Sequence, residues 1–88
     1  MIKNNIAKQK EDSRIIGSKL LLAMRLKNMD KIPFIIYHLI KQCPDGLVSK
    51  QIRKRDYSYV YTYFRISKAK WGNNQIEKCI KKLDELIL

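Results

Sequence analysis

The sequence is poor in glycine, proline and cysteine, and each shortage excludes a class of protein. Among 88 residues there are 3 glycines and 2 prolines, whereas 45% of the residues are hydrophobic and 31% are charged. Flexible linkers and collagen-like chains need more glycine and proline, and disordered chains carry fewer apolar residues. The chain is therefore expected to fold, and its length suits one small domain.

The two cysteines, Cys43 and Cys79, lie far apart in the sequence and among apolar neighbours. A zinc site needs about four ligands, usually in closely spaced pairs, so two isolated cysteines do not predict one. They are interpreted as reduced, partly buried thiols, with a disulfide between them as the alternative. The single histidine, His38, lies in an apolar run and is interpreted as a helix-face residue. No metal site is expected.

Long apolar runs and enzyme motifs are also absent. The longest apolar stretches cover residues 20–24 and 34–40, far short of the ~20 residues that span a bilayer. The first residues carry lysines without a following apolar core and cleavage site, so no signal peptide is predicted. The sequence has no glycine-rich phosphate loop, no paired carboxylates in an apolar setting and no Ser/His/Asp set. We therefore expect a cytoplasmic protein that is not an enzyme and uses no cofactor.

Acidic residues are few as well. Eight Asp and Glu residues oppose 19 Lys and Arg residues, which gives a net charge of +11. This surplus excludes an acidic mimic of DNA. Because such a charge repels itself, it usually persists where the partner is a polyanion. A nucleic acid is therefore the expected partner, and no membrane partner is expected.

Apolar periodicity predicts a mainly α-helical chain of about five helices. Residues 1–12 are interpreted as a basic flexible arm, and residues 13–88 as a single domain. Four segments have apolar residues at helical spacing and are predicted as helices: 14–27, 31–42, 48–55 and 75–88. Each has a polar residue near its start that suits a helix N-cap: Ser13, Asp30, Ser49 and Asn74.

Residues 57–66 fit two kinds of element. Their tyrosines and β-branched residues favour a strand, with aromatic and aliphatic residues alternating at a period of two. Ser58 at the start and Val60 and Phe64 on one face predict a helix instead. The helix is favoured because the segment follows a short basic helix, and a short β segment over 57–66 is the alternative.

Positive charge is concentrated between residues 50 and 70, where seven Lys and Arg residues accompany one acidic residue. Tyrosine, serine and threonine residues lie between the cations. Lys and Arg neutralise phosphates, while hydroxyl groups reach phosphate oxygens or base edges. This pattern is typical of a nucleic-acid surface, and the alternative is a solvated basic face with core tyrosines. The candidate binding residues are Lys50, Arg53, Lys54, Arg55, Tyr57, Ser58, Tyr59, Tyr61, Thr62, Arg65, Lys68 and Lys70.

The arrangement resembles the helix-turn-helix and winged-helix family of DNA-binding domains, in particular its small phage-, plasmid- or archaeal-type members. In a first register, residues 48–55 form the leading helix, 56–57 the turn and 58–70 the recognition helix. The residues that would then face the major groove are Tyr59, Tyr61, Thr62 and Arg65.

A second register places a strand at 60–66, a leading helix at 67–71 and the recognition helix at 75–86. The residues that would then face DNA are Asn73, Gln75, Lys78 and Lys81. The first register is favoured because it brings the basic patch to DNA. Neither register is followed by the glycine-turned hairpin that forms the wing in this family.

The resemblance implies a homodimer that binds double-stranded DNA with a sequence preference. Such a protein is a small transcriptional regulator, or the centromere-binding adaptor of a plasmid or phage partition complex with that complex's proteins as further partners. The apolar first helix and the amphipathic last helix are the expected dimer interface. The alternative is an RNA-binding or ribosome-associated module that uses the same patch. A third interpretation is an adaptor whose basic face meets an acidic protein or a membrane surface.

Overall fold

The computed structural model describes residues 2–88, with side chains from residue 7 onward. Its five helices are α1 (Ile2–Arg25), α2 (Ile32–Gln42), α3 (Leu47–Arg53), α4 (Ser58–Ile66) and α5 (Asn73–Ile87). Within the described residues there is no strand. The prediction of a mainly α-helical chain is therefore confirmed.

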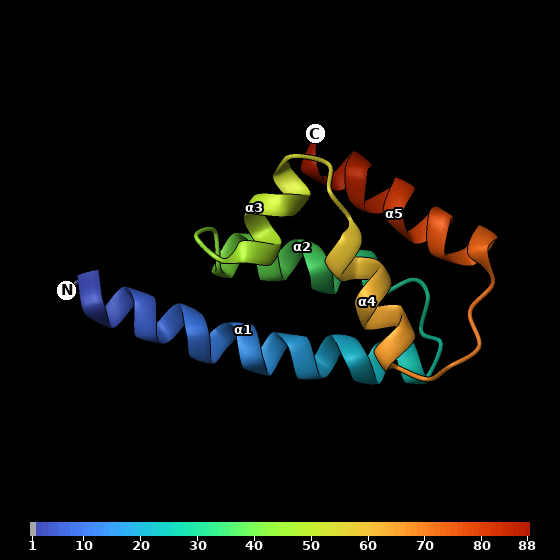
Figure 1. The fold of residues 1–88 in the computed structure, drawn as a ribbon, viewed down its shortest axis with the longest axis horizontal. Coiled ribbons are helices and arrows are strands. Elements are labelled where there is room, and N and C mark those ends of the chain that lie inside the picture. Colours follow the sequence, from blue (N-terminus) through green and yellow to red (C-terminus); the bar gives the residue numbers. More distant parts are fainter. Residues whose placement is uncertain (1) are drawn as a thin grey trace.

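The second helix lies at the centre of the arrangement. Helix α2 packs against α1, α3 and α5, while α4 packs against α1. Figure 1 shows α1 along one long side of the molecule, with α4 crossing near its C-terminal end and α5 on the opposite side. Apolar residues dominate α2, as expected of a helix that is covered on several sides. The fold thus places α4 at the surface, held by the second half of α1.

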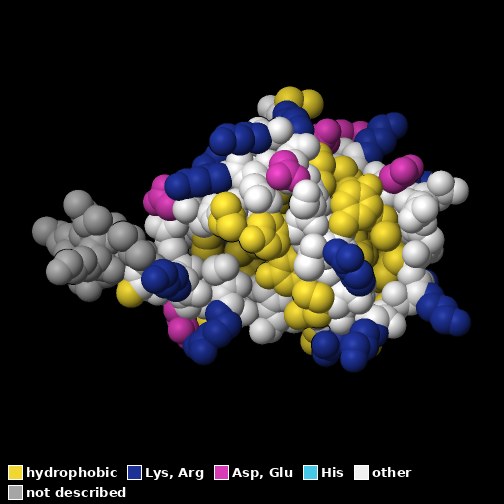
Figure 2. Space-filling model, viewed as in Figure 1, with side chains coloured by type: hydrophobic (Ala, Val, Ile, Leu, Met, Phe, Trp, Pro, Cys, Tyr) yellow, Lys and Arg dark blue, Asp and Glu magenta, His cyan; other side chains and the backbone are white. Residues whose placement is uncertain are grey.

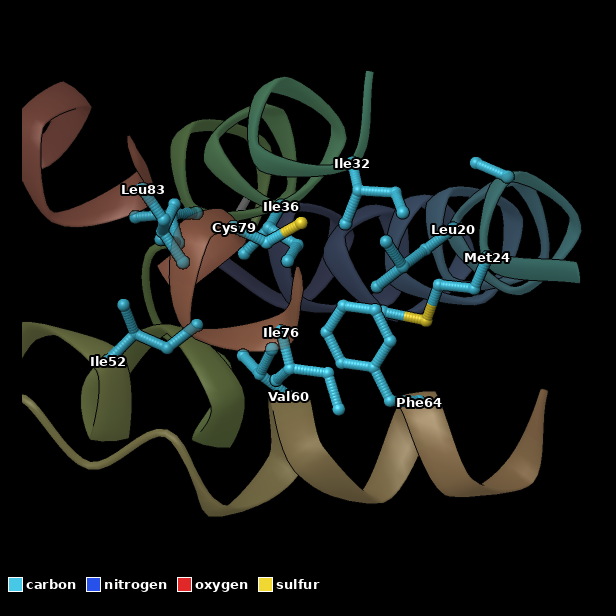
Figure 3. Close-up of a cluster of buried hydrophobic side chains, with 12 residues drawn as sticks. Leu20, Met24, Ile32, Ile36, Ile52, Val60, Phe64, Ile76, Cys79 and Leu83 are labelled. Carbon is cyan, nitrogen blue, oxygen red and sulfur yellow. The ribbon is translucent and has the colours of Figure 1, made fainter. Parts of the chain in front are cut away.

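One main core joins all five helices. Figure 3 shows side chains that converge from each of them. The most deeply buried are Leu20 and Met24 of α1, Ile32 and Ile36 of α2, Ile52 of α3, Val60 of α4 and Leu83 of α5. Burying each of these side chains contributes about 1.5–3 kcal/mol relative to leaving it exposed. The predicted inward positions Ile52, Val60 and Phe64 are thus confirmed.

The first helix begins earlier than the sequence predicts. Helix α1 starts at Ile2, so residues 2–12 continue the same helix and Ser13 is an interior residue. Ser13 as an N-cap is therefore wrong. Gln9 attaches this part of α1 to the turn after α2, because its side-chain amide donates to Asp45 Oδ2 and its amide oxygen accepts from the Asp45 backbone N–H, both at 3.3 Å.

The other three expected N-caps are also wrong. Helix α2 begins after Lys31 rather than Asp30, and its N-cap has no side-chain hydrogen bond. Gly46 precedes α3, so Ser49 lies inside the helix, where its buried hydroxyl donates to the Cys43 carbonyl at 2.6 Å. Helix α5 begins at Asn73, and Gln75 Oε1 accepts from the Gly72 N–H at 3.1 Å. Glycines, Gly46 and Gly72, hold the N-cap positions of α3 and α5 instead.

Residues 58–66 form a helix and no residue of 57–66 is in a strand, so the β alternative is wrong. Val60 and Phe64, four residues apart, are 2% and 3% exposed. That spacing brings two apolar side chains to one side of a helix, whereas on one strand they would share a face with intervening Thr62. Burial in the core outweighs the strand preference of the individual tyrosines, because such propensities are easily overridden by packing.

The two cysteines are free and buried in different clusters. Cys79 belongs to the main core, whereas Cys43 packs with Ile16 and Leu39 in a smaller cluster. The disulfide alternative is therefore not realised. Burial raises the pKa of the Cys43 thiol, with a further increase from the charge of Asp12. Burial also raises the pKa of Cys79, which keeps both thiols protonated and unreactive near neutral pH.

Candidate nucleic-acid interface

A tight turn over residues 54–57 connects α3 to α4. Its second residue, Arg55, has a left-handed backbone conformation with φ 63°. The Arg55 N–H donates to the Ile52 carbonyl at 2.8 Å, and the Asp56 N–H donates to the Gln51 carbonyl at 2.9 Å. This pair of bonds is the Schellman pattern that ends a helix. The turn therefore has a fixed geometry although it contains no glycine.

Asp56 organises the start of α4. Its Oδ1 accepts hydrogen bonds from the Ser58 N–H at 3.1 Å and from the Ser58 hydroxyl at 2.6 Å. These two bonds hold the pKa of Asp56 below its usual value, because they stabilise the charged carboxylate. Helix α4 begins at Ser58 as predicted, but Ser58 does not cap it: Tyr57 holds the N-cap position, and the oxygen that accepts from the Ser58 N–H belongs to Asp56.

The outward face of α4 carries five of the predicted residues. Ser58, Tyr61 and Arg65 are exposed, whereas Tyr59 and Thr62 are partly exposed. Thr62 Oγ1 donates to the Ser58 carbonyl at 3.0 Å and accepts from Arg65 Nη2 at 3.4 Å. The arginine is thus held along the helix surface. The structure brings together a guanidinium, two phenols and two hydroxyls on one accessible helix face.

Tyr57 is placed differently from the other candidate tyrosines. Its ring packs against the main core and its hydroxyl donates to Asp84 Oδ1 of α5. Arg55 Nε lies 3.4 Å from the same carboxylate oxygen, and the side chains of Arg55 and Asp84 are each about 40% exposed. Tyr57 and Arg55 therefore connect the α3–α4 turn to α5, a role that the sequence reasoning did not predict.

The remaining α3 cations lie beside the turn. Lys50, Arg53 and Lys54 are all exposed. Arg53 Nη2 donates to the Pro44 carbonyl at 2.7 Å, which fixes the position of its side chain without neutralising its charge. Figure 2 shows Lys and Arg side chains gathered over α3, with others over α4 and α1. Of the predicted cations in the described chain, Arg55 alone forms an ion pair.

The helix ends before the last two candidates. Helix α4 ends at Ile66, so its predicted extension to Lys70 is wrong. The buried hydroxyl of Ser67 donates to the Phe64 carbonyl at 2.6 Å, and Lys68 adopts the left-handed conformation at φ 61°. Lys68 and Lys70 are exposed on the segment that follows. They lie near the end of α4 but outside its outward face.

Sequence reasoning missed the contribution of Lys27 and Trp71. Lys27 Nζ lies 5.1 Å from the centre of the Trp71 ring and donates to the Lys70 carbonyl. The turn after α1 therefore adds a cation to the segment between α4 and α5. No sequence signal indicated this, because Lys27 and Lys70 are brought together by the tertiary fold alone.

The strand and the leading helix of the second register do not form. Residues 60–66 belong to a helix rather than a strand, and residues 67–72 contain no helix. The recognition helix of that register, 75–86, does exist as part of α5, and its Lys78 and Lys81 are exposed. Without a leading helix before it, α5 lacks the helix pair on which the second register depends.

Across the described part of the chain, no three His, Cys, Asp or Glu side chains come together as metal ligands. Among the described helices, none combines the length and the apolar character needed to cross a membrane. Comparison of the chain with protein-family models, with curated proteins and with solved structures finds no match.

Proposed function

We propose that this protein binds double-stranded DNA with a sequence preference. The observation that carries the proposal is the outward face of α4, where Tyr59, Tyr61, Thr62 and Arg65 are accessible together beside exposed cations of α3. An α-helix fits the major groove of B-DNA, and arginine and hydroxyl side chains read base edges there. The α3 cations Lys50, Arg53 and Lys54 bind the phosphate backbone, which contributes affinity without sequence information.

In this proposal α3, the turn and α4 act as a helix-turn-helix pair. Ile52 of α3 and Val60 of α4 are both buried in the main core, so each helix is anchored to the same cluster. The Schellman turn at Arg55 and the Asp56 bonds to Ser58 fix the path between them. This rigidity matters because a recognition helix must enter the groove in one orientation.

The proposed DNA-binding form is a homodimer, as suits a small transcriptional regulator or a plasmid or phage partition adaptor. Helix α5 turns its apolar residues toward α2, so its main stripe is covered within the chain. Large apolar side chains remain exposed on α1, directly after its end and at the start of α2: Ile15, Leu22, Leu26 and Phe34. Ile15 and Leu22 are seven residues apart, so they share one face of α1, and an exposed apolar face marks an interaction surface. Two-fold pairing would place two recognition helices about 34 Å apart on DNA.

The RNA-binding alternative would use a β-strand as its base-stacking surface, and that strand is not formed. Alternating aromatic side chains on a strand would offer a surface for stacking successive bases. Because residues 58–66 are helical, those tyrosines point in different directions. Duplex DNA therefore remains the favoured partner.

Fluorescence anisotropy at two salt concentrations tests the proposal, with a random-sequence duplex, single-stranded DNA and RNA as probes. We expect tight, strongly salt-dependent binding that prefers the duplex. Arg65→Gln should then relax the sequence preference. Arg14→Gln is the control, because it also removes one positive charge but on α1, where Arg14 pairs with Glu11 at 2.7 Å. This control should leave the sequence preference unchanged. Loss of preference with Lys78→Ala instead would assign recognition to α5. Absence of binding at low salt would contradict the proposal.

A further inference from the structure

A hollow lies between α4 and the start of α5. Its volume is about 370 Å³, which is at the lower end of the ~300–1,000 Å³ typical of small-ligand sites. Figure 2 shows apolar and aromatic side chains at the surface in this region. The residues that line it are Tyr61, Phe64, Arg65, Ala69, Trp71 and Ile76.

The floor of the hollow is rigid because three groups hold Trp71 in place. Its indole Nε1 donates to the Met24 carbonyl of α1 at 3.0 Å. The Phe64 ring meets it edge to face, with centroids 5.1 Å apart and planes at 70°. Lys27 Nζ lies 5.1 Å from the ring centre. The hollow is therefore formed before any ligand binds, which lowers the entropic cost of binding.

The rim of the hollow has the chemistry of a stacking site. Tyr61 is 44% exposed, and Arg65 beside it is also exposed. Phenol rings and guanidinium planes are the surfaces on which unpaired bases stack. Among the described residues no acidic side chain lines the hollow, while Lys68 and Lys70 are exposed on the segment that leads from α4 to Trp71. A nucleobase of a nucleic-acid strand is a flat, partly polar ring attached to phosphates. It therefore matches a hollow with an apolar floor and a cationic rim.

We propose that this hollow holds one unpaired nucleobase of the bound nucleic acid, stacked on Tyr61 next to Arg65. The inference rests on the proposed function, because Tyr61 and Arg65 belong both to the hollow and to the outward face of α4. It also goes further, since reading the major groove needs no unpaired base. A bulged or mismatched base is already partly unstacked, so it leaves the duplex at a smaller energetic cost than a paired one. The preferred ligand is thus a duplex that contains such a base.

Trp71 provides a direct readout, because it is the single tryptophan of the chain. The test compares three duplexes of equal length: one fully paired, one with a single bulged adenine, and one with an abasic bulge at the same place. We expect the adenine bulge to bind about tenfold more tightly than the paired duplex, within the range for stacking one base. We also expect it to quench Trp71 fluorescence, and the abasic bulge to do neither.

Variants separate stacking from general binding. Tyr61→Ala should bind the bulged and the paired duplex with equal affinity, both more weakly than wild type because Tyr61 also belongs to the outward face of α4. Tyr61→Phe keeps the ring and should retain the tenfold preference. Tyr59→Ala is the matched control, because Tyr59 lies on α4 but does not line the hollow. Thermal melting followed by circular dichroism confirms that each variant is folded.

Three results would overturn the inference. Equal affinity for all three duplexes would show that the hollow takes no base while leaving the proposed function intact. Equal enhancement by the adenine and abasic bulges would show recognition of a bend rather than of a base. If the protein bound none of the three duplexes, both the proposed function and the role of the hollow would be rejected.

Discussion

Gly17 of α1 and Tyr63 of α4 are packed so closely that a Cβ atom at position 17 would lie 3.1 Å from the Tyr63 hydroxyl oxygen. A glycine inside a helix costs about 0.5–1 kcal/mol relative to alanine. Here the missing side chain makes room for the phenol, so α4 can approach α1. The contact sets the position of the helix whose outward face forms the candidate interface.

Replacement of Gly17 by alanine tests this packing. In the wild-type background we expect little or no gain in the free energy of unfolding, because the helix preference of alanine is offset by crowding of the hydroxyl. In a Tyr63→Phe background the obstructing atom is gone, and Gly17→Ala should stabilise the protein by about 0.5–1 kcal/mol. Urea denaturation of the wild type, the two single variants and the double variant measures the energetic coupling between positions 17 and 63. An identical effect of Gly17→Ala in both backgrounds would contradict it.

The ion pair of Arg55 with Asp84 predicts unequal contributions of the basic residues to DNA binding. Lys54→Ala should lower the slope of log K against log salt by about 0.9, the value for one phosphate contact. Arg55→Ala should lower it by less, because Asp84 already compensates its charge at 3.4 Å. In an Asp84→Asn background the effect of Arg55→Ala should increase. Equal slopes for Lys54→Ala and Arg55→Ala would argue against this difference.

Asp56 should make the stability of the protein depend on pH in the acidic range. Its folded pKa is lowered by its bonds to Ser58. The carboxylate therefore stabilises the fold above its unfolded pKa of about 3.9, and this contribution is lost as the pH falls through the lower, folded value. Asp56→Ala should lower the melting temperature at neutral pH, and the difference from wild type should shrink in acid. A constant difference at all pH values would contradict the assignment.

Lys68 offers a test that separates stability from binding. Its left-handed backbone, at φ 61°, disfavours any residue with a Cβ atom. Lys68→Gly should therefore stabilise the protein by about 1 kcal/mol. Lys68→Ala keeps the Cβ and should not stabilise it. If Lys68 contacts phosphate, both variants should weaken DNA binding equally. Chemical denaturation and anisotropy titrations give the two quantities, and equal stability of the variants would refute the strain argument.

The sequence predicts the existence of the helices better than their ends. Apolar spacing locates the buried faces of α2 and α5, and α2 and α3 are separate helices as the predicted ranges 31–42 and 48–55 require. At Ser49 the expected cap was wrong because the side chain has another use: its hydroxyl donates to the Cys43 carbonyl rather than starting a helix. The turns at Arg55 and Lys68 carry no glycine, so nothing in the sequence marks their left-handed backbone.

The candidate interface was predictable in part. The outward position of Arg65 follows from helical spacing once Val60 and Phe64 face the core. The hollow was not predictable, because it depends on the hydrogen bond from Trp71 to the Met24 carbonyl across 47 residues of chain. Contacts of this kind leave no local pattern in the sequence. They become visible only when the helices are assembled.

The central position of α2 has a consequence for the way the protein loses its structure. Because α1, α3 and α5 all pack on α2, none of these helices can leave without exposing the same buried side chains. Partial forms that keep α2 but lack a neighbour are therefore costly, and the chain is expected to unfold in one cooperative step. The amide protons of α2 should therefore exchange with solvent only through that global transition.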